Sequence, residues 1–376
     1  MKKLTPIILF TIPNFDTAGS GKALLNIAKR LDKNIITPQI CCSHSKGEFF
    51  KTVKKSGIKV HIKETTHEMI PRFTGLKKCI RLASFFKSLN ISMIHSFHYS
   101  DDYSEALAAK MAGIPWIYTK KNMNWGGKSK NSWLLRSLLS KYIIAQNNDM
   151  LNTFFKNSKK ATLVPRGISI DEYNNNNNNN NSLLESHGIP RNNKIILCVA
   201  NLTPVKGIEI LLIAFNFLFK EIKNIHLIIV GDNKNKYGED LIVLSKKMDS
   251  SSNIIFKNKT MRIQDYYSIA NFFVLPTNKK GEGCPVALLE AMASNLIVFG
   301  SNISGIKDIL SDTPENLFQE GDSVDLKNKL KKALFLDKNK LKKQIIKNRN
   351  KIKKYYSIEL ETLRHENIYK KILNLA

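Results

Sequence analysis

Cysteine is scarce in this chain of 376 residues, and its pattern fits neither a metal site nor a disulfide framework. The five cysteines are odd in number and scattered, with no Cys-x-x-Cys pair and no Cys/His cluster at zinc-ligand spacing. We therefore expect no structural zinc, and a reducing compartment is favoured over an extracellular one.

Long apolar runs are also absent. No stretch approaches the roughly 18 to 20 apolar residues that a membrane-spanning helix needs. Residues 7–10 are apolar, but Thr11, Pro13 and Asp16 end this stretch before it reaches the length of a signal peptide. We expect a cytoplasmic protein, with peripheral attachment to the inner face of the cytoplasmic membrane as a further expectation.

Acidic side chains are few: 31 Asp and Glu stand against 59 Lys and Arg, a formal net charge of +28. Residues 1–170 hold 28 basic and 9 acidic side chains, so most of the excess lies in the first half. Such a charge favours anionic partners. The sequence has no zinc-finger spacing, no RNP motif and no basic region followed by heptads, so we expect no specific nucleic-acid partner.

Apolar runs of strand length alternate with helical patterns along the whole chain, which indicates parallel strands joined by crossover helices. The strands expected in the first half are 6–12, 37–42, 59–62, 92–96, 116–119, 142–145 and 161–164. Those expected in the second half are 194–200, 225–230, 253–256, 272–275 and 296–299. The sequence therefore predicts an α/β protein with two doubly wound domains.

A run of asparagine interrupts this alternation at residues 174–181 and has nothing to bury. We expect an N-terminal α/β domain over 1–170 and an Asn-rich exposed linker over 171–190. A second α/β domain is expected over 191–350, followed by a helix over 351–376 for which packing on either domain is open.

The segment 281–295 carries the chemistry that is easiest to interpret. Glu282 and Gly283 lie in a loop after the strand that ends at Leu275, and Pro285 suits the first position of the helix that follows. The N-terminus of a helix offers free N–H groups and partial positive charge, which suit a diphosphate.

Glu290 is the only charged residue in the apolar helix 286–293. An unpaired charge is costly to bury, so this carboxylate needs hydrogen-bond donors, and sugar hydroxyls are suitable. The alternative is that Glu290 caps a helix or pairs with a lysine of this lysine-rich chain.

The two carboxylates Glu282 and Glu290, with seven residues between them, resemble the Glu-x7-Glu signature of GT-B glycosyltransferases of the large retaining family 4. The resemblance covers nearly the whole chain. It includes the segments 199–207, 228–232, 164–168, 304–305 and 356–359 with Tyr369. It implies the GT-B fold: two Rossmann-like, doubly wound parallel-sheet domains that face a cleft. By this resemblance the N-terminal domain, 1–170, binds the acceptor and the domain 191–350 binds the nucleotide-sugar. The C-terminal helix, 351–376, is expected to return to the N-terminal domain.

The resemblance also implies roles. Glu290 binds the ribose hydroxyls of a sugar nucleotide, and Glu282 binds the transferred sugar, with backbone N–H groups of Gly283 and Cys284. Lys206 is placed on the diphosphate, where a fixed cation stabilises the leaving group. No cofactor or metal is implied, in keeping with the lack of an Asp-x-Asp pair in the expected site, and the nucleotide diphosphate-sugar is the co-substrate.

The chain departs from the family pattern at Asn201, where an arginine commonly accompanies the lysine on the donor phosphates. Some members carry arginine two positions later, where this chain has Thr203. We therefore predict that Lys120, Lys121 or Arg166 supplies the missing charge.

The loop 17–22 of the first half follows the first strand and opens a helix. Its glycines Gly19 and Gly21 could let the backbone approach the donor phosphates or the acceptor. A tight strand-to-helix turn with no ligand is the alternative. His95 and His98 lie at a strand end where one could touch the acceptor hydroxyl, with a structural histidine as the alternative.

The resemblance predicts a retaining transferase that moves a sugar from UDP- or GDP-sugar to a glycan or lipid-linked acceptor in cell-surface polysaccharide or lipopolysaccharide synthesis. A sugar-nucleotide-binding protein with weakened or lost activity, another GT-B sugar-nucleotide enzyme and a nucleic-acid-binding module stay as alternatives. Because such acceptors are often lipid-linked, we expect an anionic membrane surface as a partner of the first domain. The predicted contacts are Lys51, Lys54, Lys55, Arg72, Lys77, Lys78, Arg81 and Lys87, with Phe73, Phe85 and Phe86.

Overall fold

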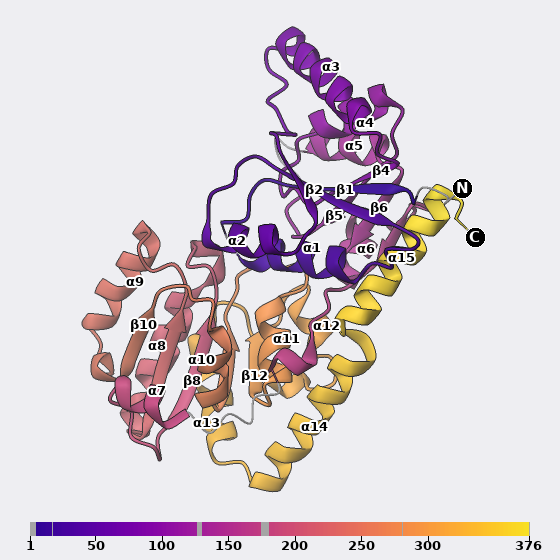
Figure 1. Cartoon of the computed structure of the whole chain (residues 1–376). Coiled ribbons are helices and arrows are strands. Elements are labelled where there is room, and N and C mark those ends of the chain that lie inside the picture. Colours follow the sequence, from indigo (N-terminus) through magenta and orange to yellow (C-terminus); the bar gives the residue numbers. More distant parts are fainter. Residues whose placement is uncertain (1–4, 17, 126–129, 174–179, 280, 376) are drawn as a thin grey trace. The chain divides into compact units, whose positions relative to one another are not determined.

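The computed structural model describes residues 5–16, 18–125, 130–173, 180–279 and 281–375 (Figure 1). The chain forms two compact units, each with its own sheet. The first unit consists of Met1–Arg166 and Ile358–Ala376, and the second of Gly167–Ser357. The first unit is thus built from both ends of the chain.

The first unit contains a seven-stranded sheet in the order β3-β2-β1-β4-β5-β6-β7, in which every neighbouring pair is parallel. Its strands are β1 (Ile7–Ile12), β2 (Thr37–Cys42), β3 (Lys59–Ile62), β4 (Met93–Ser96), β5 (Trp116–Lys120), β6 (Tyr142–Ala145) and β7 (Ala161–Leu163). Its helices are α1 (Ala18–Arg30), α2 (Glu48–Lys55), α3 (Arg72–Ser88), α4 (Ser104–Ala112), α5 (Lys130–Leu139), α6 (Asn148–Phe154) and α15 (Ile358–Leu373). The strand order reverses direction between β1 and β4, as in a doubly wound sheet.

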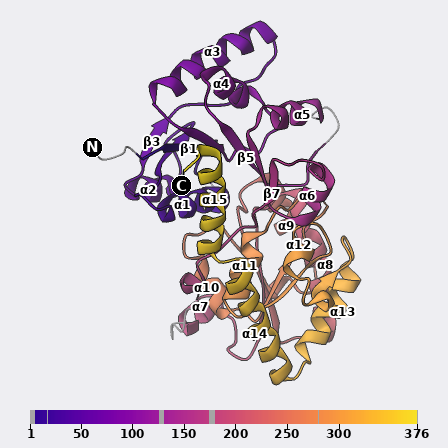
Figure 2. The ribbon, with the colours of Figure 1, turned by 90° about the vertical axis from the view of Figure 1, so that its right-hand side faces the viewer.

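Two apolar cores cover the two faces of this sheet. Helices α1, α2 and α15 pack on one face, where Ile358, Ile368 and Tyr369 of α15 join the core. Helices α3, α4 and α5 lie on the other face (Figure 2). A strand buried on both faces needs apolar side chains at nearly every position, which explains why its sequence is a continuous apolar run.

The second unit contains a six-stranded parallel sheet in the order β10-β9-β8-β11-β12-β13. Its strands are β8 (Lys194–Val199), β9 (Ile225–Val230), β10 (Ile254–Lys257), β11 (Phe272–Leu275), β12 (Ile297–Ser301) and β13 (Leu317–Phe318). Its α-helices are α7 (Asn180–Ser186), α8 (Ile208–Glu221), α9 (Lys236–Lys246), α10 (Ile263–Ile269), α11 (Val286–Ala293), α12 (Ile306–Ile309), α13 (Ser323–Leu334) and α14 (Lys338–Tyr355). The short 3-10 helices are η2 (Ile170–Tyr173), η3 (Pro204–Lys206), η4 (Ser251–Asn253) and η5 (Pro314–Asn316).

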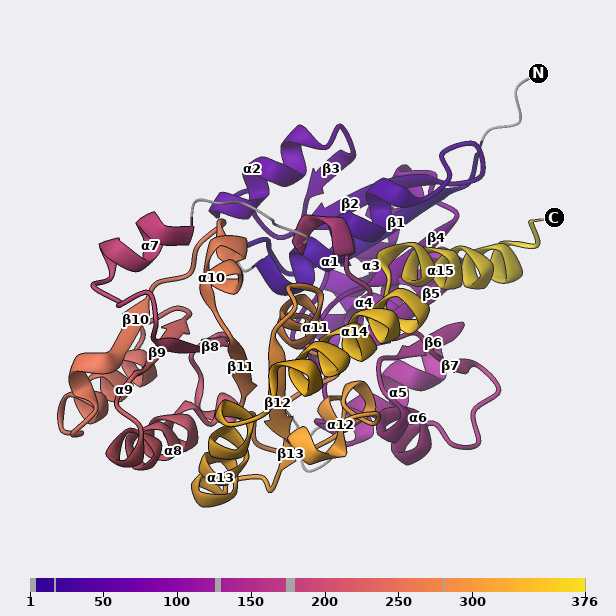
Figure 3. The same cartoon turned by 90° about the horizontal axis from the view of Figure 1, so that it is seen from below.

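Helices again cover both faces of this sheet. Figure 3 shows α8, α9 and α13 on one side and α10, α11 and α14 on the other. The strand order reverses between β8 and β11, and loops at the carboxyl ends of strands next to such a reversal commonly form ligand sites. The predicted fold class, parallel α/β with two doubly wound sheets, is confirmed.

The range 171–190, expected to be an exposed linker, lies within the second unit. Tyr173 and Ile189 are both buried in its core, and helix α7 packs against α10. Residues 174–179 of the asparagine run lie outside the described residues. The low-complexity composition of the asparagine run therefore gave no sign that Tyr173 and Ile189, on either side of it, pack in the core of the second unit.

The C-terminal segment divides between the units. Helix α14 packs on α11 in the second unit and ends at Tyr355, and α15 begins at Ile358 and packs on α1 in the first unit. Among the described residues, no helix combines the length and the apolar character needed to cross a membrane.

Candidate functional site

Two loops meet at the carboxyl edge of the second sheet, one after β8 and one after β11. Glycine allows them to approach closely. A Cβ atom on Gly207 would lie 2.4 Å from the carbonyl oxygen of Pro276, and the φ angle of Gly207 is +58°. A Cβ atom on Gly231, which follows β9, would lie 2.1 Å from the carbonyl oxygen of Ala200. The backbone therefore places the residues that follow β8 directly beside those that follow β11 and β9.

Lys206 and Glu282, which are far apart in the sequence, form an ion pair here. The Nζ atom of Lys206 lies 2.5 Å from Oε1 of Glu282, and Oγ1 of Thr277 donates to the same oxygen at 2.8 Å. The side chain of Lys206 is 18% exposed and that of Glu282 is 8% exposed. The two residues predicted to be catalytic are thus brought together, and water screens their interaction only weakly.

Helix α11 starts at the same loop. The sequence predicted Pro285 at the first position of the helix. In the structure Pro285 is the extended residue just before the helix, and Val286 is the first helical residue. Gly283 and Cys284, predicted to bind the donor, are buried beside Glu282. Helix α11 therefore begins shortly after Glu282 in the sequence.

Glu290 lies one helical turn further along α11 and is buried. The hydroxyl of Tyr267 donates to its Oε2 at 3.0 Å, and the hydroxyl of Tyr173 donates to its Oε1. Burial, together with the charge of Glu290, raises the pKa of both tyrosines, so both hydroxyls stay protonated and can donate. Two neutral hydroxyl donors thus contact this carboxylate.

Sequence reasoning missed Tyr173, Tyr267 and Thr277. Tyr173 stands at the edge of the asparagine run, and Tyr267 occupies a core position of α10. A tyrosine at a core position does not by itself indicate a functional site, because only the fold shows that its hydroxyl reaches a carboxylate.

Asn201 and Thr203 are both exposed, and because their side chains are uncharged, neither supplies a second cation to the loop after β8. Residues 258–261 are exposed at the end of β10. Lys259 in this loop lies 3.7 Å from Asp232 at the end of β9. These residues all belong to loops at the same edge of the sheet as Lys206.

The two glycines of the first unit differ in their surroundings. Both lie in the first turn of α1, which starts at Ala18, before the glycines. A Cβ atom on Gly21 would lie 2.7 Å from the ring of Phe15, whereas one on Gly19 would meet nothing within 4 Å. Close packing on Phe15 explains Gly21 without a ligand.

Lys120 is 99% buried in its own unit. Its Nζ donates at 2.8 Å to three oxygens, the two of Asn122 and the carbonyl of Asn124, and lies 4.0 Å from the ring centre of Trp133. Burial lowers the pKa of Lys120 to about 7. All three donors are used locally, which argues against the predicted phosphate contact.

Lys121 is also held within the first unit. Its ammonium donates to the carbonyl of Phe97 and lies 3.5 Å from the ring centre of Tyr99 and from Oγ of Ser20. Burial, followed by the charges of Arg166 and Arg136, lowers its pKa well below the usual value. Lys121, directly after β5, therefore contacts the loop after β4 and the first turn of α1.

Arg166 does not supply a free charge. Its Nη1 lies 3.0 Å from Oε1 of Glu361 on α15, and both side chains are buried. The predicted phosphate contact is replaced by an internal ion pair.

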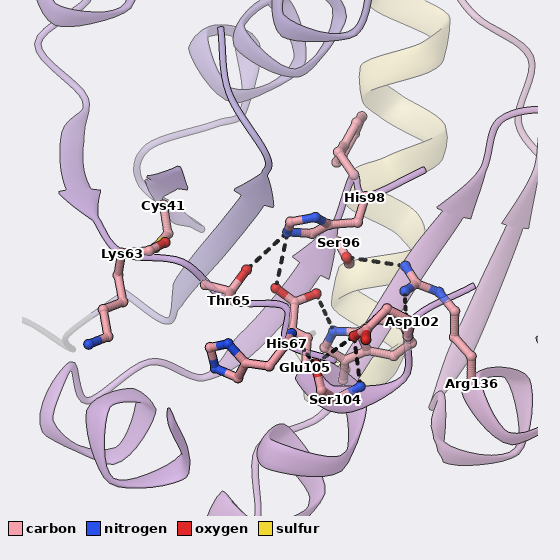
Figure 4. A network of polar contacts seen from close by, with 12 residues as sticks. Cys41, Lys63, Thr65, His67, Ser96, His98, Asp102, Ser104, Glu105 and Arg136 are labelled. Atoms are coloured by element: carbon pink, nitrogen blue, oxygen red, sulfur yellow. Dashed lines mark hydrogen bonds and ion pairs between the residues drawn. The ribbon is translucent and has the colours of Figure 1, made fainter. Parts of the chain in front are cut away.

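The two histidines have internal partners as well. His95 is fully buried between Tyr369 at 2.7 Å and Thr119 at 2.8 Å. His98 is bound to Thr65 at 2.9 Å and lies 3.6 Å from Glu105 (Figure 4). Burial lowers the pKa of His98 to about 4, so the ring is neutral near pH 7. These contacts fit the alternative of structural histidines, not contacts with the acceptor.

The described part of the chain contains no group of three His, Cys, Asp or Glu side chains that could hold a metal ion.

Comparison with known proteins gives matches in both halves of the chain. Residues 17–172 match the model of Glycosyltransferase Family 4, and residues 179–352 match the model of Glycosyl transferases group 1. A glycosyltransferase from Rickettsia africae has a similar structure, with a TM-score of 0.86, 20% identity, and coverage of 99% of this chain and 100% of that one. An Anabaena protein solved with UDP and glucose gives a TM-score of 0.81 at 15% identity, over 96% and 99% of the two chains.

Among curated relatives, the lipopolysaccharide 1,2-N-acetylglucosaminetransferase of Salmonella typhimurium is 26% identical over 199 residues, which is 50% of this chain and 51% of that protein. The chain thus spans about half the length of this relative. The two doubly wound parallel sheets are the architecture of the GT-B class, to which the similar solved structures belong. The chain belongs to the GT-B glycosyltransferases, with one family model matching each half.

Proposed function

We propose that this protein is a retaining glycosyltransferase that moves a sugar from a UDP- or GDP-sugar to a glycan or lipid-linked acceptor in cell-surface polysaccharide or lipopolysaccharide synthesis. The observation that carries the proposal is the Lys206–Glu282 pair, which stands at the reversal of strand order together with Glu290 on the next helix. The lipopolysaccharide relative and the Anabaena protein solved with UDP and glucose support the acceptor class and the donor class.

The residues suit the proposed chemistry. When the bond between the sugar and the diphosphate breaks, negative charge develops on the leaving phosphate, and the ammonium of Lys206 can stabilise it. Glu282 is already a hydrogen-bond acceptor for Lys206 and Thr277, so one further donor, a hydroxyl of the sugar, fits its remaining lone pairs. In the retaining route proposed here the acceptor hydroxyl attacks from the face of the leaving group and passes its proton to the leaving phosphate. No nucleophile from the protein is then required.

A thermal-shift panel of UDP, GDP, ADP, CMP and their sugar conjugates tests the donor site. A ligand at about 100 times its Kd adds about 2.7 kcal/mol of stability. We expect one nucleotide diphosphate to shift the melting temperature in the wild type and not in Glu290→Ala. The control is Glu239→Ala, which removes an exposed glutamate of α9 and should keep the shift. If no nucleotide stabilises the wild type, the proposal is wrong.

A sugar-nucleotide-binding protein without turnover is the second candidate. It is favoured by the absence of charge at Asn201 and Thr203, which leaves Lys206 as the cation of that loop. Release of UDP or GDP from its sugar conjugate in the presence of acceptor lipid extract separates the two candidates. Donor binding without transfer to any acceptor would favour the second.

We also propose that helix α3 attaches the protein to an anionic membrane surface. Ile70 is 85% exposed, Phe73 70% and Ile80 52%, and Arg72, Lys77 and Arg81 are exposed beside them. Of the predicted aromatic contacts, Phe73 is exposed, whereas Phe86 is fully buried and does not belong to this surface. Basic side chains next to apolar ones suit an interface of anionic headgroups and acyl chains.

Sedimentation with vesicles of phosphatidylglycerol and phosphatidylcholine at low salt tests this surface. We expect the wild type to pellet and the double variant Phe73→Ser, Ile80→Ser to stay in the supernatant. Val243→Ser, which removes an exposed apolar side chain of α9, is the control and should pellet. A wild type that stays in the supernatant would exclude this attachment.

A further inference from the structure

Two tyrosines from different elements donate to the two oxygens of one buried carboxylate, Glu290. We infer that Tyr173 and Tyr267 are positioning residues that aim this carboxylate at the ribose hydroxyls of the nucleotide. The inference rests on the proposed function, since it concerns the same donor site, and it assigns a role to two residues outside the family motif.

The geometry fixes the orientation of the carboxylate. Tyr267 on α10 donates to Oε2 at 3.0 Å and lies 3.2 Å from the carbonyl oxygen of Ala287, one turn before Glu290. Tyr173 on η2 donates to Oε1. Because each oxygen has a donor on a different rigid element, rotation of the carboxylate about its last side-chain bond would break both hydrogen bonds. A carboxylate held in this way loses little conformational freedom when it binds a ligand.

The two rings also support each other. Their centres lie 5.9 Å apart with the planes at 78°, an edge-to-face contact. Tyr173 is 4% exposed and Tyr267 1%, whereas Glu290 is 8% exposed. Segment η2 packs against both α10 and α11, so the tyrosines and the glutamate form one packed unit.

The choice of tyrosine has a chemical consequence. A lysine at either position would neutralise Glu290, but a tyrosine hydroxyl donates a hydrogen bond and leaves the negative charge in place. An ionised carboxylate has about four lone-pair sites, two on each oxygen, so a single tyrosine donor does not use the full acceptor capacity of either oxygen. A vicinal diol such as that of ribose can then donate one hydroxyl to each oxygen, in a charge-assisted hydrogen bond that is stronger than a neutral one.

The test compares ribonucleotides with their 2′-deoxy analogues. Calorimetry measures the Kd of UDP, GDP, 2′-deoxy-UDP and 2′-deoxy-GDP for the full-length wild type, Tyr173→Phe, Tyr267→Phe and Glu290→Ala. In the wild type we expect the preferred ribonucleotide to bind about tenfold more tightly than its deoxy analogue, which is the effect of about one hydrogen bond to a charged group. Each tyrosine variant should reduce this ratio at least about threefold, and Glu290→Ala should bring it close to one.

Tyr266→Phe is the matched control. Tyr266 neighbours Tyr267 on α10 and stacks on His187, and its hydroxyl has no hydrogen-bond partner among the described residues. This variant should keep both the affinity and the ratio of the wild type. Phenylalanine keeps the ring in each variant, and melting curves by far-UV circular dichroism verify that the fold is retained.

The outcomes separate the inference from the proposed function. If the tyrosine variants weaken ribo- and deoxynucleotide equally and keep the ratio, the tyrosines act only in packing and the inference is overturned, while the donor site stands. If Glu290→Ala keeps the ratio, Glu290 does not bind the ribose and the inference is overturned, while the proposed function stands as long as the wild type binds a nucleotide. A wild type that binds neither nucleotide refutes the proposed function and the inference with it.

Discussion

The buried ion pair between Arg166 and Glu361 predicts a large and local loss of stability when its charge balance is broken. The two side chains are 4% and 1% exposed and lie 3.0 Å apart, and they connect α15 to the end of the segment after β7. Removal of one partner of a buried pair typically costs about 3–5 kcal/mol, because the remaining charge is left uncompensated. Glu361→Gln keeps the shape of the side chain and an acceptor oxygen, so we expect the low end, about 3 kcal/mol.

Tryptophan fluorescence during urea unfolding measures this loss selectively. All three tryptophans, Trp116, Trp125 and Trp133, belong to the first unit. With a urea m-value of about 2–3 kcal/mol per M, a loss of 3 kcal/mol lowers the fluorescence midpoint by about 1 to 1.5 M.

Glu359→Gln on the same helix is the matched control. Glu359 is 71% exposed and 3.9 Å from Arg30, so its substitution should cost less than about 1 kcal/mol. Equal midpoints for Glu361→Gln and Glu359→Gln would refute the reasoning that α15 is held to the first unit by a buried charge pair.

Three other predictions concern the loops and the buried polar residues. Gly207→Ala should destabilise the second unit by about 2 kcal/mol or more, because the added Cβ would clash with the carbonyl oxygen of Pro276. The control Gly188→Ala has a φ of +63° but open space around the added Cβ, so it should cost about 1 kcal/mol. Urea unfolding monitored by circular dichroism measures both losses. Burial lowers the pKa of His98 to about 4, so between about pH 6.5 and 4 the unfolded chain binds more protons than the folded one, and stability falls as the pH is lowered through this window. In His98→Gln the unfolding free energy, monitored by fluorescence, should change less steeply with pH, by up to about 1.4 kcal/mol per pH unit. An unchanged slope would contradict the buried neutral ring. Lys206→Ala should slow transfer by about 10²- to 10³-fold in an assay of released nucleotide, and a change below threefold would exclude its role on the leaving group.

The strands could be predicted from the sequence because most are buried on both faces. The predicted ranges 37–42, 59–62, 142–145, 225–230 and 272–275 coincide with β2, β3, β6, β9 and β11. A strand covered by helices on both faces shows as an apolar run that turn residues end sharply. β13 was missed, since two residues, Leu317 and Phe318, are too short for any periodic signal.

The site was predictable only as far as its motif extends. The proximity of Lys206 and Glu282 was expected from the family pattern, because both follow neighbouring strands. The burial of Lys120 and of Arg166 was not, since the partners that enclose them come from non-local packing, as with Glu361 on the last helix. Charge in a loop that follows a strand therefore does not predict an exposed charge in the folded protein.

The pairing of Ile168 with Ser357 brings the two ends of the second unit together. This unit is one uninterrupted length of chain, whereas the first unit needs α15 from the far end to complete the core around Tyr369. During synthesis, the ribosome therefore releases every residue of the second unit before the first unit has its last helix. We expect the second unit to finish folding first, so that the order of folding on the ribosome runs against the order of the sequence.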